Sequence, residues 1–222
     1  MDWREGLTLR FTEFPIAKEG LLLFVPLFII TVILAFFITP YLTLLLVFID
    51  LFLLYFFRNP KREIPDSEGC VVAPADGRVV YAGECMEDRI LGGKTYKISI
   101  FMSIFNVHIN RIPLSGRITN VYYTKGKFLS ANLDKASILN EHNALLMETD
   151  DKRKVLFVQI AGLIARRIVC WINEGDRVLR GQRFGLICFG SRLDIFLPLD
   201  TGIDIRVGQR VKGGETILGY MS

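Results

Sequence analysis

The residues able to do chemistry are few, and the least ordinary of them is a Gly-Ser pair inside an apolar run. Residues 186–198 read LICFGSRLDIFLP, with Gly190 and Ser191 near the middle. Read as one strand, the run places Ser191 in phase with Leu193 and Ile195 on its apolar face. A glycine there weakens the strand, and a hydroxyl among apolar neighbours is costly. A serine held in this way is a candidate nucleophile, provided that a base and an acid lie beside it.

Candidates for that base and acid are His108 in FNVHINRIP, His142 in NEHN and Asp76 in PADG. Each also has an ordinary structural explanation, either as a hydrogen-bonded histidine or as an aspartate that forms a turn before glycine. Neither histidine lies in an H-E-x-x-H pattern, and the four cysteines form no C-x-x-C pair. We therefore expect no metal site.

These residues follow a long apolar segment, residues 21–57, in which Asp50 is the one charged residue. A segment of this length predicts membrane-embedded helices. It is broken near Thr39-Pro40, and each half would extend only about 26 Å as a helix. We expect an α-helical membrane hairpin after a flank over residues 1–20. A single span kinked at the proline is the alternative.

A polar linker over residues 58–69 separates this segment from the rest of the chain. It begins with Arg58, Lys61 and Arg62, and basic residues beside an apolar segment predict the cytoplasmic side of the cell membrane. The cysteines would then be thiols. The net charge of +4 suits an anionic lipid surface. The chain has no long basic run or recognition motif, which argues against nucleic-acid binding.

Residues 70–222 contain short β-branched runs separated by Gly, Asp and Asn turns, which predicts a mainly β domain. Residues 128–143 lack alternation and are expected to form a helix or a loop. Two pairs of segments repeat: 175–184 with 208–217 at an offset of 33, and 74–80 with 113–119 at an offset of 39. The repeats favour a barrel-sandwich domain of the lipoyl-like or biotinyl-like type.

Four motifs in this domain resemble the phosphatidylserine decarboxylase family in its short, membrane-anchored form. They are PADG at 74–77, MSIFNVHINRIPLSG at 102–116, NEHN at 140–143 and FGSRLD at 189–194. They occur in the family's order and cover the domain after the linker. The resemblance implies a lipid substrate with a serine headgroup, a membrane as partner and a homodimer.

The resemblance further implies self-processing between Gly190 and Ser191, which would give chains 1–190 and 191–222. Ser191 would become a covalent pyruvoyl group, which acts as an electron sink for decarboxylation. The family pattern assigns the orienting acid to Asp76. His108 is the candidate acid for returning a proton to the product, since imidazole titrates near working pH.

One departure leaves the base for self-cleavage open. Larger relatives carry a second histidine three residues after the first, and here that position is Arg111. His108 could serve both steps, and His142 is the other option. Cations for the headgroup could come from Arg111, Arg166, Arg167 and Arg192, although a solvated basic face would explain them equally well.

Two other functions are compatible with the sequence. An archaetidylserine decarboxylase would act on the same headgroup joined to ether-linked chains. A non-catalytic, membrane-anchored adaptor module would need only the barrel-sandwich repeats.

Overall fold

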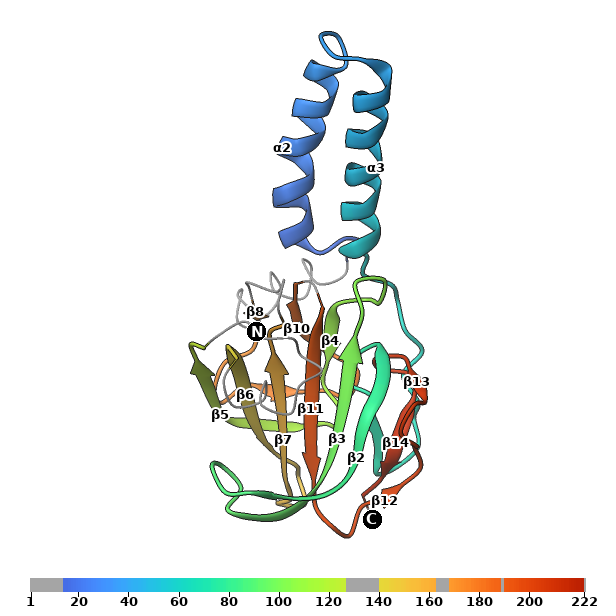
Figure 1. Ribbon diagram of the computed structural model, residues 1–222. Coiled ribbons are helices and arrows are strands. Elements are labelled where there is room, and N and C mark those ends of the chain that lie inside the picture. The colour runs from blue at the N-terminus through green and yellow to red at the C-terminus, as the bar shows by residue number, and fades with distance from the viewer. Residues whose placement is uncertain (1–13, 127–139, 163–167, 189, 222) are drawn as a thin grey trace. The chain divides into compact units, whose positions relative to one another are not determined.

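The computed structural model describes residues 14–126, 140–162, 168–188 and 190–221. The chain divides into two compact units, residues 1–61 and residues 62–222, and each is described here by itself. The first unit is helical and the second consists of strands (Figure 1).

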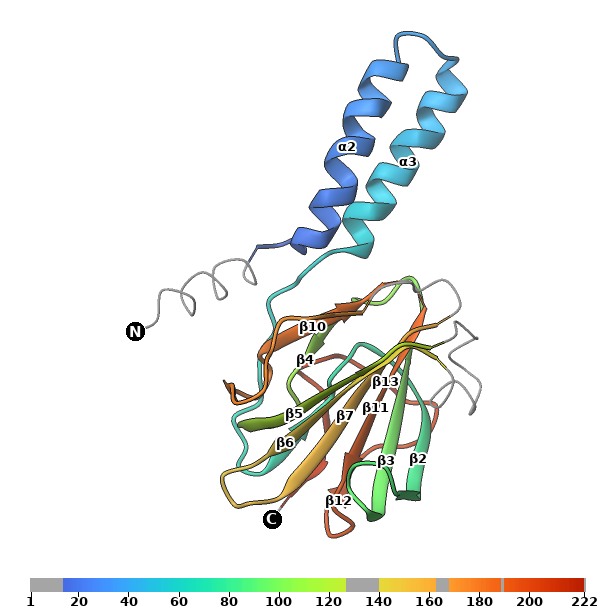
Figure 2. The same cartoon turned by 90° about the vertical axis from the view of Figure 1, so that its left-hand side faces the viewer.

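Two helices of 17 residues make up the described part of the first unit: α2 (Lys18–Leu34) and α3 (Pro40–Phe56). They lie side by side (Figures 1 and 2). The break expected near Thr39-Pro40 falls at the start of α3, where a proline is tolerated because its missing N–H would have no intrahelical partner. The N–H of Ala17 donates to the carbonyl of Phe57, which joins the start of α2 to the end of α3.

The expectation of membrane-spanning helices is not supported. Within the part of the chain that the structure describes, no helix is both long and apolar enough to cross a membrane. Each helix rises about 26 Å at about 1.5 Å per residue, which is short of a hydrocarbon core of about 30 Å.

The second unit is mainly β, as the sequence predicted. Its strands are β1 (Cys70–Val72), β2 (Gly77–Glu87), β3 (Gly93–Met102), β4 (Ile109–Arg111), β5 (Gly116–Thr124), β6 (His142–Glu148), β7 (Lys154–Ile160), β8 (Ile168–Cys170), β9 (Arg177–Val178), β10 (Arg183–Ile187), β11 (Ser191–Leu197), β12 (Gly202–Ile203), β13 (Arg210–Val211) and β14 (Ile217–Tyr220). Of residues 128–143, predicted as helix or loop, 128–139 lie outside the described residues, and β6 begins at His142. The four cysteines are recorded as thiols and not as disulfides.

An eight-stranded sheet dominates this unit, in the order β13-β2-β3-β11-β7-β6-β5-β9. It curls into a half-barrel (Figures 1 and 2). Two three-stranded sheets, β1-β14-β12 and β4-β10-β8, accompany it. Every pairing recorded between these strands is antiparallel.

The strand orders show that the unit is built from two equivalent halves. Strands β1, β2 and β13 correspond to β4, β5 and β9, and both edges of the large sheet therefore have the same construction. Val211 of β13 pairs with Gly77, and Val178 of β9 pairs with Gly116. These pairs carry the offsets of 33 and 39 seen in the sequence, so the repeats mark a real internal duplication.

Close backbone contacts explain why the repeats retain glycine. A Cβ on Gly77 would lie 2.2 Å from the carbonyl oxygen of Phe101, and one on Gly116 would lie 2.5 Å from that of Glu148. The two halves also exchange equivalent hydrogen bonds. The N–H of Val72 donates to the carbonyl of Pro113, and the N–H of Arg111 donates to that of Pro74.

The main core lies on the concave side of the large sheet. Side chains two residues apart along a strand point to the same face. Leu193, Ile195 and Leu197 of β11 accordingly join this core with residues from the other strands. The rings of Phe157 and Phe184 meet there edge to face, with centroids 5.1 Å apart.

We predict that this core carries most of the stability of the unit. Leu145 of β6 is fully buried in it, whereas Leu179 is 68% exposed. Leu145→Ala should lower the free energy of unfolding by about 2–5 kcal/mol, and the matched Leu179→Ala by less than about 0.5 kcal/mol. Urea denaturation measures both. Equal losses would contradict the assignment of the core.

Candidate functional site

Ser191 is the first residue of β11, and its Cα pairs with that of Met102 in β3. The expected inward direction is confirmed, because the side chain is fully buried on the face of Leu193 and Ile195. Its hydroxyl oxygen has no hydrogen-bond partner among the described residues. A buried, unsatisfied hydroxyl is costly, so its presence at this position requires an explanation.

The expectation of one continuous strand over residues 186–198 is wrong. The run forms two strands in different sheets: β10 ends at Ile187 and β11 begins at Ser191. Gly190 has a φ of +59° there, a left-handed conformation that other residues rarely adopt. A Cβ at Gly190 would meet no atom within 4 Å, so the bend and not crowding explains the glycine. The chain therefore turns sharply just before the serine.

His108 precedes β4 and is buried. Its carbonyl accepts a hydrogen bond from the N–H of Ile187, four residues before Ser191. The ring Nδ1 lies 3.0 Å from the carbonyl oxygen of Asn106, an acceptor only. Nδ1 must then carry the proton, which leaves Nε2 to give or take one. His108 thus contacts the last residue of β10, four residues before Ser191 in the chain.

Asp76 is engaged by two other groups. Both of its carboxylate oxygens accept from Arg62, at 3.0 and 2.8 Å, and Oδ1 also accepts from the N–H of Gly213. The Arg62 and Asp76 side chains are only 8% and 13% exposed. Arg62 also pairs with Glu215. In the described part of the chain, the recorded hydrogen bonds of Asp76 hold the start of β2 in place.

The duplicated half shows which part of this arrangement is structural. Ser115 stands where Asp76 stands, and its Oγ accepts from the N–H of Arg180. Arg180 and Gly213 are separated by the same offset of 33 as the repeats. A side chain that holds this turn is therefore common to both halves. The carboxylate and its Arg62 partner distinguish the half that contains Asp76.

Arg111 belongs to the same charge cluster. It is buried, and its guanidinium donates to the carbonyl of Gly181 at 2.9 Å. Burial lowers the pKa of Arg111 to about 10, with further lowering by Arg183 and Arg62. Asp76 acts in the opposite direction. The structure thus brings Arg111 together with Asp76.

Arg192 follows the candidate nucleophile but points to the opposite face of the sheet. Its guanidinium is buried against the carboxylate of Asp194, with Nε 2.9 Å from Oδ1. Lys97 of β3 lies 3.0 Å from the other oxygen of Asp194. Arg192 therefore helps to fix the side chain of Asp194 on the outer face of β11.

His142 lies on the same outer face as Arg192. Ile160 of β7 pairs with His142 on one side and with Arg192 on the other. The ring Nδ1 of His142 lies 2.8 Å from the carbonyl oxygen of Asn140, the same arrangement as at His108. Arg166 and Arg167, the other candidate cations, lie outside the described residues.

Sequence reasoning missed three charged residues of this region: Arg62, Lys97 and Asp194. Arg62 was interpreted only as part of the basic flank. The one signal for Asp194 is its phase with Arg192, which places opposite charges on one face of a strand. Among the described residues, no cluster of three potential metal-ligating side chains occurs.

Comparison with known proteins gives a consistent result. The phosphatidylserine decarboxylase family profile matches residues 49–219. The phosphatidylserine decarboxylase proenzyme of Syntrophus aciditrophicus is 48% identical over 92% of this chain and 96% of its own length. That of Geobacter sulfurreducens is 53% identical over 78% of this chain and 79% of its own.

The profile covers the whole β unit up to β14, and the relatives match at about half of the aligned positions. The chain therefore belongs to the phosphatidylserine decarboxylase family.

Proposed function

We propose that the protein is a self-processing decarboxylase that converts phosphatidylserine to phosphatidylethanolamine and CO2. The observation that carries the proposal is Ser191, whose buried hydroxyl lacks a partner among the described residues and follows the left-handed Gly190. The relatives' names, which say decarboxylase and proenzyme, support it. They also favour this activity over archaetidylserine decarboxylation or a non-catalytic adaptor.

Self-processing uses only the chain's own atoms and one water. The Oγ of Ser191 attacks the carbonyl carbon of Gly190, the peptide C–N bond breaks, and the serine proton passes to the freed nitrogen. A base then removes the Cα proton of the resulting ester, and the carboxylate of Gly190 leaves from Cβ. Water replaces the nitrogen of the dehydroalanine, which releases ammonia and leaves a pyruvoyl group on residue 191.

The site fits a pyruvoyl group at position 191, because Ser191 is buried and its hydroxyl has no competing hydrogen bond among the described residues. The group supplies an electron sink for loss of the carboxylate. His108, with Nδ1 held by Asn106, is suited to move protons through Nε2 during cleavage or decarboxylation. His142 is the other candidate base, although its neighbours are on the outer face.

The role of Asp76 is to position the start of β2 next to β3, the strand that lies between β2 and β11. Gly77 begins β2, whose register places it one residue beyond the Arg78–Phe101 pair and beside Met102, the residue of β3 that pairs with Ser191 on its other side. Arg62 fixes the carboxylate and anchors the segment before β1. Arg111 adds charge to this cluster and does not need to touch the headgroup.

We further propose that the enzyme works at a lipid surface, at the cytoplasmic face of the cell membrane, as a homodimer. The exposed apolar side chains of α2 and α3 support contact with lipid. Within the β unit, duplicated hairpins with left-handed glycines at equivalent turns, Gly175 with Gly208 and Gly181 with Gly214, support kinship with barrel-sandwich domains.

Self-cleavage should break the peptide bond between Gly190 and Ser191. The wild-type protein should appear by intact mass as residues 1–190 and residues 191–222, the latter with a carbonyl-reactive end. Ser191→Ala should leave one chain of 222 residues and release no CO2 from phosphatidylserine. The surface variant Ser115→Ala should cut itself as the wild type does. CO2 release by an uncut Ser191→Ala protein would rule out the mechanism.

The bend at Gly190 should set the rate of the cut. Alanine in the left-handed region costs about 1–2 kcal/mol, so Gly190→Ala should slow self-cleavage roughly tenfold. Gly208 also has a positive φ and open space around it, which makes Gly208→Ala the matched control. Cleavage is followed on denaturing gels after synthesis in vitro. Equal slowing of both variants would show that general strain, and not the bend, is responsible.

The buried ion pair between Arg62 and Asp76 should contribute more to the free energy of unfolding than an exposed ion pair does. Arg62→Ala leaves the carboxylate of Asp76 buried without its cation and should cost about 3 kcal/mol of unfolding free energy and slow self-cleavage. Arg177 and Asp150 form an exposed pair, so Arg177→Ala should cost less than about 0.5 kcal/mol. Unfolding is measured in the uncut Ser191→Ala background. Unchanged cleavage in Arg62→Ala would contradict the positioning role.

A further inference from the structure

The convex face of the large sheet carries a second apolar cluster, separate from the main core. Strands β6, β7 and β11 contribute to it in register, and their outward side chains form three rows across the strands. The rows are His142, Ile160 and Arg192; Ala144, Val158 and Asp194; and Leu146, Leu156 and Phe196. The first row lies one residue from Ser191, and the last lies near the far end of β11.

The turn between β2 and β3 covers the far end of these rows. The carboxylate of Glu87 accepts from the N–H groups of Arg89, Ile90 and Leu91, which fixes the turn. Ile90 and Leu91 pack against the apolar cluster. The β2–β3 turn therefore covers one end of the three rows.

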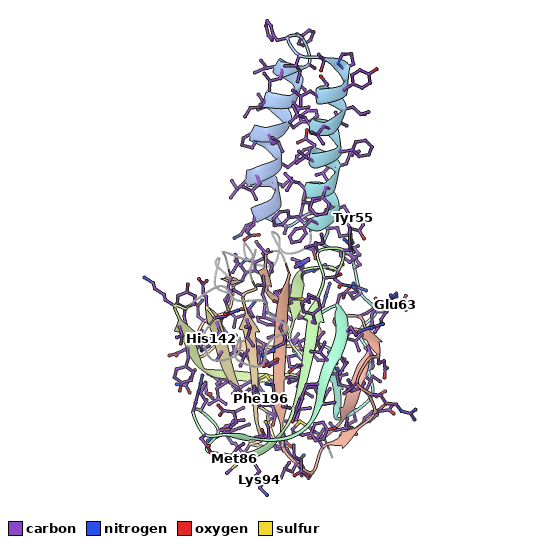
Figure 3. The ribbon with its side chains drawn as sticks, in the orientation of Figure 1. Tyr55, Glu63, Met86, Lys94, His142 and Phe196 are labelled. Atoms are coloured by element: carbon purple, nitrogen blue, oxygen red, sulfur yellow. The ribbon has the colours of Figure 1, made fainter. Side chains whose placement is uncertain are left out.

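Between the turn and the rows lies a cavity of about 360 Å3. Its size falls within the range of small-molecule sites, about 300–1,000 Å3. Its walls are mostly aliphatic or aromatic and include Cys85, Met86, Ile90, Ala144, Leu156, Val158, Ile160 and Phe196. In Figure 3 the labelled His142, Phe196 and Met86 follow one another down the sheet, from the end where β11 begins toward the β2–β3 turn.

The cavity also has polar lining residues: Asp194, Lys97 and His142 on the sheet, and Glu87, Asp88 and Arg89 at the turn. Two of the carboxylates have recorded partners. The carboxylate of Asp194 is held by Arg192 and Lys97, and the carboxylate of Glu87 is held by backbone N–H groups. The Lys97 ammonium also lies 5.5 Å from the centre of the Phe196 ring. The apolar rows between these polar groups suit an aliphatic chain.

The dimensions agree with one acyl chain. From Leu156 to Ile160, both of which line the cavity, β7 rises about 13 Å at about 3.3 Å per residue. An acyl chain crosses half of a hydrocarbon core of about 30 Å, which is about 15 Å. At its upper end the cavity reaches Ile160, whose strand position pairs with Arg192, the residue after Ser191. A lipid bound there could place one chain along the outer face.

We propose that this cavity, defined by rows of β6, β7 and β11 under the β2–β3 turn, binds one acyl chain of the serine phospholipid. The inference rests on the proposed function and adds the site that holds the apolar part of the substrate. The acyl chain lies away from the headgroup that reacts. A substitution in the cavity should therefore change the discrimination between long-chain and short-chain lipids and leave self-cleavage unchanged.

Val158→Phe fills the middle of the cavity, and Val80→Phe makes the same change at an exposed position of β2 outside it. Decarboxylation of dipalmitoyl and dihexanoyl phosphatidylserine is measured in the same detergent micelles. Val158→Phe should lower the ratio of the two rates about tenfold, the effect of about two methylenes losing contact. Val80→Phe should retain the wild-type ratio.

Complete self-cleavage is the check that each variant folds. If Val158→Phe is not cleaved, the milder Ala144→Val provides the same comparison. An unchanged ratio in a cleaved cavity variant, or an equal fall in both valine variants, overturns the acyl-chain site. A wild-type protein that releases CO2 from neither lipid contradicts the proposed function itself, which separates the two failures.

Discussion

The rest of the structure depends on the position of β11 between β3 and β7. Its seven residues are paired with β3 along their full length and with β7 over most of it. This double pairing fixes which face each side chain takes. Ser191 is directed into the concave core, while Arg192 and Asp194 are directed to the convex face. The candidate nucleophile and the apolar cavity therefore lie on opposite sides of one strand.

The duplication explains how a small unit holds such a site. The two halves have the same turns, the same glycine contacts and the same exchange of backbone hydrogen bonds. The candidate chemistry lies where they differ. Asp76 replaces Ser115 and acquires Arg62 as a partner. Ser191 and His108 likewise stand at positions that the shared turns do not require. The duplicated framework supplies rigidity, and a few substitutions add reactivity.

Much of this was predictable from the sequence, for physical reasons that also set the limit. Equal spacing of Gly77 with Gly116 and of Val178 with Val211 predicted the duplicated hairpins, because such turns need glycine at fixed positions. Alternation gave the direction of Ser191. The break before it was not visible, because the apolar phase continues from Ile187 across the bend to Leu193.

Contacts between residues distant in the sequence were the second feature that could not be predicted. Nothing near Arg62 in the chain indicates that it, and not Arg58 or Lys61, pairs with Asp76. Apolar content alone also could not determine how long the helices of residues 21–57 would be. Pairing across many residues and the ends of helices depend on packing, which a single sequence does not display.

The order of the strands has a consequence for a protein that cuts its own chain. The second half, β4 to β10, is inserted between β3 and β11 of the first half. A cut before Ser191 would therefore separate β11 to β14 from the strands that surround them without loosening any of their pairings. The 32-residue piece would stay in the sheet, because β11 remains hydrogen-bonded to β3 and β7 on both sides. The new chain end at residue 191 would therefore keep its place at the start of β11.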